Sequence, residues 1–248
     1  MKRLRLVSFL AESAAEHYRQ VGTIAARACG LMPGTLEEPG LERLDETLAQ
    51  QGPALVFLCG LPYTRQRDAG AALEPLAAPV PEGEELAVYY AKLVTRAGLT
   101  VLDETCLMAY NGVDSFSGWV LPRSGLSRRL YSRTVCSGSH RSSLRMLVSG
   151  EADAAAVDST VLALEAHAEA DIAALPVVER VGPVPSPPVA IANGTPELSR
   201  MLRSALTSLQ DDPLGRIALD AGLVRRYEPV ADSAYDAVRK LDAARNQA

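Results

Sequence analysis

The chain has 248 residues, of which 48% are hydrophobic and 22% are charged, and its net charge at pH 7 is −5. This composition is typical of a globular protein that forms one large domain or two modest lobes. The acidic balance and the lack of any basic run or basic-aromatic stripe argue against binding to nucleic acid or to an anionic membrane, and no apolar stretch is long enough to span a bilayer.

The amino-terminal segment points to a cytoplasmic protein as the sequence is written. Its apolar run, "LVSFLA", has six residues, which is shorter than the roughly 7–15 residues of a signal-peptide core. A periplasmic location is the alternative, if a natural leader has been removed.

Strand-like and helix-like segments alternate along the chain, which predicts an α/β protein with mostly parallel sheets. Ser13 is expected to cap the first helix and Gly30 to end it, and "GLPYTR", residues 60–65, is expected to form a turn. In the first part of the chain the pattern predicts strands at residues 3–10, 53–60 and 87–96 and helices at residues 13–30 and 41–52.

The middle of the chain repeats a strand-helix unit, and the end is mostly helical. The predicted strands cover residues 105–112, 133–139 and 153–159, with two more extended pieces within residues 175–194. The predicted helices cover residues 115–128, 142–151, 160–171, 195–210, 213–222 and 233–247. Thr195 is the expected cap of its helix, with Pro196 at the first helical position.

Two extended segments are candidates for crossings between lobes. One is the strand at residues 87–96, and the other is the proline-rich stretch "ERVGPVPSPPVAIA", in which proline favours extended backbone. A chain that crosses out and back forms a discontinuous lobe of residues 1–88 plus 183–248 and an inserted lobe of residues 89–182. Ligands of such proteins bind in the cleft between lobes, at the carboxyl ends of strands and the amino ends of helices.

Two polar clusters precede predicted helices in the inserted lobe. In "YNGVDSFSGW", Ser115 and Ser117 offer hydroxyls beside the unpaired N–H groups of a helix start, and in "SGSHRSSL", Ser139 and His140 repeat the arrangement. Such groups bind oxyanions. Plain helix capping is the alternative for each cluster alone, but two clusters in one strand-helix block are expected to meet at one sheet edge.

Three further side chains are candidates for the same site. Asp158 ends the strand "ADAAAVD" and is either the cap of the next helix or an acceptor for a ligand. Tyr63 follows the buried strand of the first lobe, and Tyr89 lies on the crossing strand, so both are expected to face the cleft. The four cysteines, Cys29, Cys59, Cys106 and Cys136, lack zinc-binding spacing and are expected to be buried free thiols.

These segments, in this order, resemble the PhnD-like family of substrate-binding proteins from phosphonate, phosphite and phosphate ABC transporters. The family's Ser-x-Ser-Gly loop resembles Ser115-Phe116-Ser117-Gly118, its Ser-Gly-Ser-His-x-x-Ser-Leu helix start resembles "SGSHRSSL", and its acidic strand resembles "GEADAAAVD". The tail "GLVRRYEPVADSAYDAVRKL" is also similar to the family's ending. Phe116 stands where the family has a small hydroxyl residue, which removes one donor.

The resemblance implies a two-lobed, type 2 periplasmic-binding-protein fold and a non-catalytic binder of a small oxyanion, acting as a transport receptor or a sensor. It implies that Ser115, the Phe116 backbone, Ser117, Gly118, Ser139 and His140 hold the oxyanion. Asp158 would receive a proton or amine of the ligand, and Tyr63 and Tyr89 would line the pocket. An ABC permease is the implied partner, and no cofactor or metal is expected. The alternative is a cytoplasmic enzyme on the same fold, with His140 and Asp158 as an acid/base pair.

Overall fold

A computed structural model describes residues 2–126 and 128–245 of the chain. Residues 127, 246 and 247, which belong to two of the predicted helices, lie outside the described residues. Contacts divide the chain into two compact units: unit 1 contains Met1–Val88 and Pro185–Asp236, and unit 2 contains Tyr89–Val184 and Ala237–Ala248. The carboxyl-terminal segment thus groups with unit 2, whereas the sequence analysis placed residues 183–248 in the first lobe.

Unit 1 is built on a mixed sheet, whose described strands follow the order β11-β4-β10-β3-β1-β2. The strands are β1 (Arg3–Ser8), β2 (Met32–Glu37), β3 (Ala54–Phe57), β4 (Leu73–Pro81), β10 (Val189–Ala192) and β11 (Val224–Pro229). β1 runs parallel to β2 and β3, while β10 is antiparallel to both of its neighbours and β11 is antiparallel to β4.

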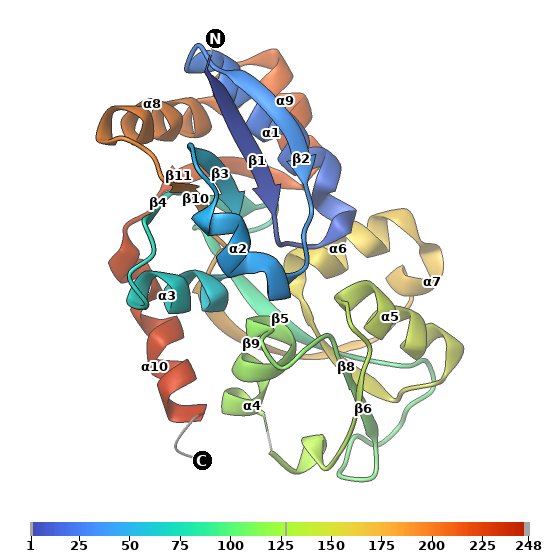
Figure 1. Cartoon of the computed structure of the whole chain (residues 1–248). Helices are drawn as coiled ribbons and strands as arrows, with labels where there is room; N and C mark the ends of the chain where they lie inside the picture. Colours follow the sequence, from blue (N-terminus) through green and yellow to red (C-terminus); the bar gives the residue numbers. More distant parts are fainter. Residues whose placement is uncertain (1, 127, 246–248) are drawn as a thin grey trace. The chain divides into compact units, whose positions relative to one another are not determined.

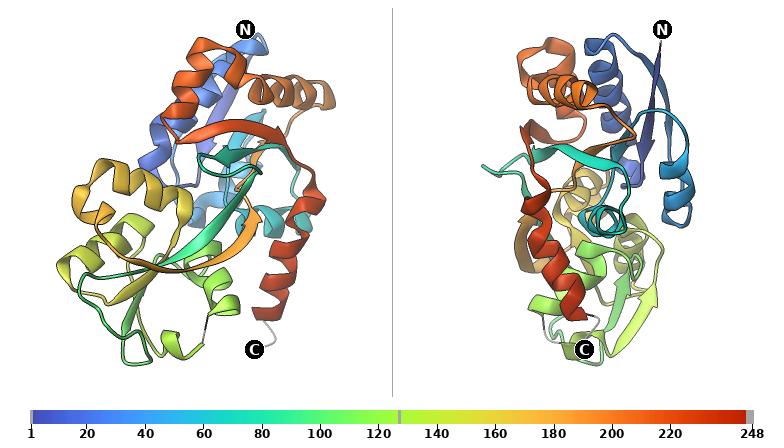
Figure 2. Two further views of the ribbon diagram at one scale, coloured as in Figure 1. Left: turned by 180° about the vertical axis from the view of Figure 1, so that it is seen from behind. Right: turned by 60° about the vertical axis from the view of Figure 1, so that its left-hand side comes forward.

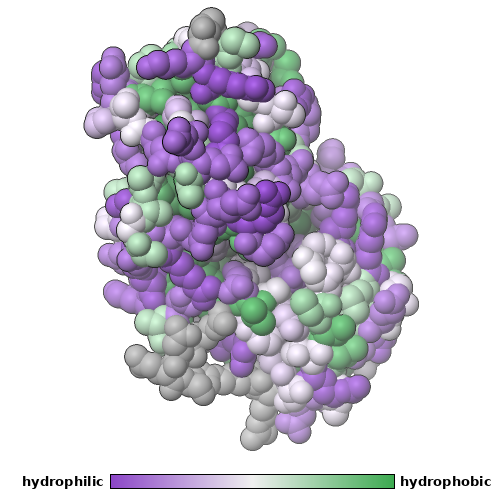
Figure 3. Space-filling view, in the orientation of Figure 1, coloured by the Kyte–Doolittle hydropathy of each residue, from purple (hydrophilic) through white to green (hydrophobic). Residues whose placement is uncertain are grey.

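Three helices of unit 1 share one apolar core with its sheet. They are α1 (Ala15–Ala28), α8 (Pro196–Thr207) and α9 (Pro213–Asp220), and they lie close together beside the sheet in Figures 1 and 2. Their side chains, including Val21, Leu202 and Leu219, pack against strand residues such as Leu55 and Ile191. The shorter helices α2 (Leu44–Ala49) and α3 (Gly60–Asp68) complete the unit, and the surface around them in Figure 3 is mainly hydrophilic.

Unit 2 has a mixed sheet of its own, whose described strands follow the order β7-β6-β8-β5-β9. The strands are β5 (Val88–Thr95), β6 (Leu107–Tyr110), β7 (Arg133–Cys136), β8 (Ala154–Asp158) and β9 (Val177–Pro185). β7, β6 and β8 are parallel to one another, and β5 is antiparallel to β8. The three parallel strands are the ones that carry the predicted polar clusters at their carboxyl ends.

Helices of unit 2 follow each of these parallel strands. β6 leads into a π-helical turn, Phe116–Val120, that continues as α4 (Leu121–Gly125). β7 leads into α5 (His140–Ser149), and β8 leads into α6 (Ser159–Ala168) and α7 (Ala170–Ala173). Leu144 and Leu147 of α5 and Leu162 of α6 pack on Ala109 and Ala155, and the small strand side chains leave room for the larger helix side chains.

The last helix, α10 (Asp236–Arg245), begins where the chain leaves unit 1. Hydrogen bonds join the three segments of unit 1 at which the chain enters or leaves this unit. Ser186 N donates to Ala87 O at 2.9 Å, and the buried Tyr235 hydroxyl donates to Ser186 O at 2.9 Å. The segments just before residue 88, just after residue 185 and just before residue 236 are therefore held as one network within unit 1.

The α/β class expected from the sequence is confirmed, and several local expectations need correction. The sheets are mixed rather than mostly parallel, because β10, β11 and β5 run against their neighbours. Residues 60–65 begin α3 instead of forming a turn, and Ser13 lies in a short 3₁₀ turn without capping α1, whose cap position is Ala14.

None of the four cysteines forms a disulfide in the described structure, and they are not all buried. Cys106 is buried, Cys29 and Cys59 are half-buried, and Cys136 is exposed. Cys136 ends β7, an edge strand of its sheet, so its side chain has a neighbouring strand on one side only. Within the described residues, no cluster of His, Cys, Asp or Glu is suited to hold a metal ion, and no helix is long and apolar enough to span a membrane.

Candidate functional site

Three polar turns meet at one edge of the sheet of unit 2. Because β7, β6 and β8 are parallel, their carboxyl ends lie on the same side of the sheet. Ser137 N, just past β7, donates to Tyr110 O at the end of β6 at 2.8 Å, and β8 packs against the helical turn that follows β6. The polar clusters of the sequence are therefore neighbours in space.

The turn after β6 is held by its own first serine. Ser115 precedes the helical turn, and its Oγ accepts a hydrogen bond from Gly118 N at 3.0 Å. Ser117 and Gly118 are buried, and the Phe116 side chain is fully buried. At this turn Phe116 therefore has only its backbone to offer to a ligand, and its role in binding stays a prediction.

The turn after β7 is held by a cluster of serine hydroxyls. Ser139 caps α5, because its Oγ accepts from Ser142 N at 3.0 Å. Ser137 Oγ lies 2.7 Å from Ser143 Oγ. Gly138 takes a φ of +84°, in the left-handed region that glycine adopts most easily. His140 is the first residue of α5 and is aimed at the neighbouring turn.

A direct contact joins these two turns. Ser117 Oγ and His140 Nε2 lie 3.1 Å apart. Burial lowers the pKa of His140 to about 4, so the imidazole is neutral at pH 7. Its second nitrogen, Nδ1, is buried and has no hydrogen-bond partner among the described residues. The neutral imidazole has one N–H donor and the serine has one O–H donor, and their mutual contact uses one of the two. An anion that replaces this contact meets two donors and no charged side chain.

Asp158 is the cap of α6. Its Oδ1 accepts hydrogen bonds from Thr160 N at 2.8 Å, Thr160 Oγ1 at 2.6 Å and Val161 N at 3.4 Å. Oδ2 takes none of these bonds. Burial raises the pKa of the Asp158 carboxyl, and the hydrogen bonds from Thr160 and Val161 act in the opposite direction. The capping role is thus observed, and one carboxylate oxygen is left over for another donor.

The two predicted tyrosines are both buried, in different units. Tyr63 belongs to α3 of unit 1; its hydroxyl donates to Asp232 Oδ1 at 2.6 Å and its ring lies 4.9 Å from that of Tyr235. Tyr89 lies on β5 of unit 2, beside Tyr90, whose N donates to Ser159 Oγ at 3.1 Å. A ligand-binding role for either tyrosine, and the cleft between lobes, stay predictions.

Asn111 is a polar residue of this region that the sequence analysis did not single out. It directly follows β6, and its Oδ1 is buried without a hydrogen-bond partner among the described residues. A Cβ atom on Gly118 would overlap this oxygen, so the two residues are in close contact. The contact depends on the folded turn, and nothing in the local sequence predicts it.

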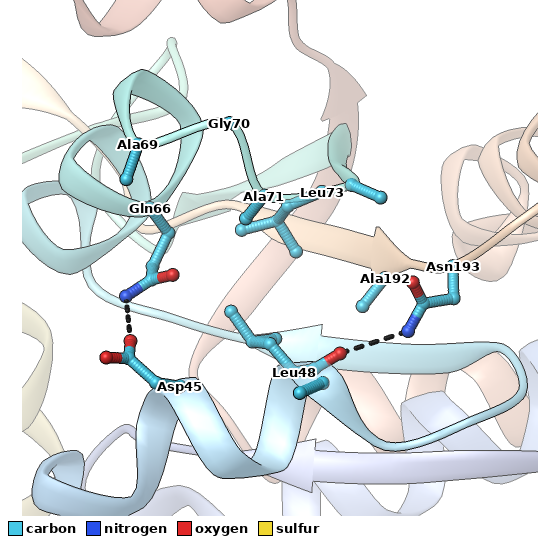
Figure 4. A pocket seen from close by; sticks show the side chains of 11 residues that line it. Asp45, Leu48, Gln66, Ala69, Gly70, Ala71, Leu73, Ala192 and Asn193 are labelled. Carbon is cyan, nitrogen blue, oxygen red and sulfur yellow. Dashed lines mark hydrogen bonds between the residues drawn. The ribbon is translucent and has the colours of Figure 1, made fainter.

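A pocket of about 470 Å³ lies elsewhere, in unit 1, where β4 begins at Leu73 and β10 ends at Ala192 (Figure 4). Three polar side chains that line it already make hydrogen bonds. Gln66 donates to Asp45 Oδ1 at 2.6 Å, and the Asn193 amide donates to Leu48 O at 3.0 Å and to Gln50 O at 3.1 Å. None of the predicted ligand-binding residues lines it.

Solved structures show which fold the chain has. The chain is similar to a PhnD protein from Prochlorococcus marinus in complex with methylphosphonate, with 13% identity, a TM-score of 0.80 and coverage of 100% of this chain and 99% of that chain. It is also similar to a binding protein component of an ABC phosphonate transporter from Pseudomonas aeruginosa, with 12% identity, a TM-score of 0.78 and coverage of 97% and 85%. A third similar structure, from Xanthomonas citri, contains a chloride ion; it has 19% identity, a TM-score of 0.71 and coverage of 97% and 96%. The fold is that of the periplasmic binding proteins.

The family itself follows from the sequence. The profile of the periplasmic substrate-binding proteins of phosphonate ABC transporters matches residues 40–235. The chain belongs to this family, as its motifs indicated. No curated protein sequence matches the chain.

Proposed function

We propose that this chain is a solute receptor that binds a phosphonate or a similar small oxyanion at the strand-end turns of unit 2. The 3.1 Å contact between Ser117 Oγ and His140 Nε2 carries the proposal, since it brings the two predicted anion-binding turns together. The family membership and the methylphosphonate complex of the Prochlorococcus protein support the same ligand class.

Asp158, the acidic cap of α6, favours ligands that carry a hydrogen-bond donor. Asp158 Oδ2 takes none of the capping bonds of α6, and β8, which Asp158 ends, packs on the turn that contains Ser117. The negative charges of the Asp158 carboxylate and of a ligand anion would repel each other by roughly 4 kcal/mol if they were about 4 Å apart at an effective dielectric near 20. A ligand that carries a donor, either a protonated oxyanion or an ammonium group, replaces this repulsion with a charge-assisted hydrogen bond. The preferred ligand is therefore a hydrogen phosphonate or an aminophosphonate.

A catalytic role for His140 and Asp158 finds no support in their contacts. His140 Nε2 contacts Ser117, and Asp158 Oδ1 is engaged with the start of α6. The Ser117–His140 pair resembles the nucleophile and base of a hydrolase, but such a base needs a third group to orient its other nitrogen. His140 Nδ1 has no such partner among the described residues.

Family membership supports a location and a partner for the proposed receptor. Its members are periplasmic and belong to ABC transporters. We therefore favour the periplasmic alternative over the cytoplasmic location inferred from the amino-terminal segment, with the permease of a phosphonate transporter as the partner.

A calorimetric panel tests the proposal with sulfate, methylphosphonate and 2-aminoethylphosphonate against wild type and Asp158→Asn. Wild type is expected to bind the two phosphonates and to reject sulfate. Asp158→Asn keeps an acceptor for the cap but loses the negative charge. The difference between the dissociation constants for sulfate and for 2-aminoethylphosphonate should therefore become smaller in this variant.

Asp212→Asn is the matched control, because Asp212 caps α9 in unit 1 by accepting from Gly215 N at 2.8 Å. This variant should keep the ligand preference of the wild type. If wild type binds sulfate as tightly as the phosphonates, Asp158 serves only as a helix cap, and if it binds none of the three, the receptor proposal is wrong.

A further inference from the structure

Asn111 occupies the central position among the three turns. It continues β6, which lies between β7 and β8 in the sheet. The pairing of Ala109 with Ala155 places residue 111 alongside Val157, next to Asp158. On the other side, Ser137 N donates to the carbonyl of Tyr110, the preceding residue. Because neighbouring strands are about 4.8 Å apart, Asn111 lies within side-chain reach of both flanking turns.

The amide of Asn111 is oriented by the glycine of the anion loop. Oδ1 fills the space where a Cβ of residue 118 would stand, and that Cβ would also lie 3.0 Å from Ser115 Oγ. Only Gly118 leaves room for this contact. Oδ1 is fully buried there and has no hydrogen-bond partner among the described residues, whereas Asn111 as a whole is only half-buried, and none of the hydrogen bonds seen among the described residues involves its Nδ2. The amide thus turns its acceptor inward and leaves its donor available.

We infer that Asn111 is an additional ligand-binding residue, whose Nδ2 donates a hydrogen bond to the same oxyanion that Ser117 and His140 bind in the proposed site. The inference rests on the proposed function. The Nδ2 donor would also replace the hydroxyl donor that the family has at position 116, where the buried Phe116 side chain offers none. Because Nδ2 contacts the oxyanion and not the organic substituent, its contribution is the same for every phosphonate.

Two substitutions of Asn111 test this role by calorimetry with methylphosphonate and 2-aminoethylphosphonate. Asn111→Ala should weaken binding of both by about 10- to 150-fold, the range for loss of a hydrogen bond to a charged group. Asn111→Asp has the same shape but replaces the donor with a negative charge, so it should weaken binding of both by more than about 100-fold. A thermal unfolding curve for each variant shows whether the fold is retained.

Asn193→Ala is the matched control, since the Asn193 amide is tied to Leu48 O and Gln50 O in unit 1. It should lower the unfolding temperature and leave both dissociation constants unchanged.

A double-mutant cycle with Gly118→Ala separates contact with the ligand from support of the loop. The new methyl group must displace the Asn111 amide, so Gly118→Ala alone should weaken binding about as much as Asn111→Ala. In the double variant the methyl group occupies the vacated space, so the two effects should not add. Fully additive losses would contradict the assigned contact.

The outcomes distinguish this inference from the proposed function. A wild type that binds phosphonates, together with folded Asn111→Ala and Asn111→Asp proteins of wild-type affinity, overturns the role of Asn111 alone. A wild type that binds neither phosphonate overturns both. Loss of affinity for only one of the two ligands would place Asn111 at the organic substituent and overturn the oxyanion assignment.

Discussion

Two serines of one short motif have different tasks at the residue scale. Ser115 Oγ accepts the hydrogen bond of Gly118 N at 3.0 Å, whereas Ser117 Oγ contacts His140 Nε2 at 3.1 Å. The first contact holds the turn, and the second brings together the two turns that we propose bind the ligand. Substitution of each serine by alanine should therefore have a distinct effect.

Ser115→Ala should lower the free energy of unfolding by about 0.5–2 kcal/mol, as for loss of a helix cap. Ser117→Ala should weaken methylphosphonate binding by about 10- to 150-fold, with a smaller effect on the fold. Chemical denaturation and calorimetry on both variants give the two quantities. A Ser117→Ala protein with an unchanged dissociation constant and a lowered melting temperature would show that Ser117 has only a structural role.

The sequence reveals part of this site and hides part of it. Ser115, Ser117 and His140 stand out because polar residues before helices follow short apolar strands, and the parallel order of the strands predicts that they meet. Asn111 does not stand out, because its position matters only through its contact with Gly118 in the folded turn. The inward direction of the Phe116 side chain likewise depends on the packed core.

At the scale of elements, proline explains most of the segments that the sequence analysis missed. β4 contains Pro75, Pro79 and Pro81, and its pairing with β10 and β11 shifts register in two places. A proline-rich segment resembles a loop in sequence because proline cannot donate to a sheet. In α3, Pro62 lies in the first turn, where its missing N–H has no helical partner to lose.

The hydrogen bonds at the chain boundaries of unit 1 lead to a prediction for the buried Tyr235. Tyr235→Phe removes the donor to Ser186 O and leaves that carbonyl unpaired, which should lower the free energy of unfolding by about 1–3 kcal/mol. Tyr131→Phe is the control, because the buried Tyr131 hydroxyl has no hydrogen-bond partner among the described residues, and its removal should be neutral or stabilising. Urea unfolding measures both, and equal effects of the two substitutions would contradict the account.

At the scale of the whole molecule, two buried histidines predict sensitivity to acid. Burial lowers the pKa of His17 in unit 1 and of His140 in unit 2 to about 4, whereas histidine in an unfolded chain titrates near 6.5. Between these values the unfolded state binds more protons. Stability should therefore fall as the pH is lowered from about 6.5 to about 4, by up to roughly 1.4 kcal/mol per pH unit for each histidine.

The raised pKa of Asp158 offsets part of this loss of stability. As the pH falls, the Asp158 carboxyl is protonated in the folded state before it is protonated in the unfolded state, which favours the folded state. His140→Asn should reduce the pH dependence in this window, and substitution of the exposed His167 by Asn should leave it unchanged. Urea unfolding at a series of pH values checks both variants. A wild type of constant stability from pH 6.5 to pH 4 would contradict the burial of neutral histidines.

The most direct test of the binding site is a crystal structure of the protein with methylphosphonate. We expect the phosphonate oxygens to lie within about 3.2 Å of Ser117 Oγ and of a ring nitrogen of His140, the range of a hydrogen bond. A phosphonate bound away from these turns, for example in the pocket beside Asp45 and Asn193 in unit 1, would contradict it.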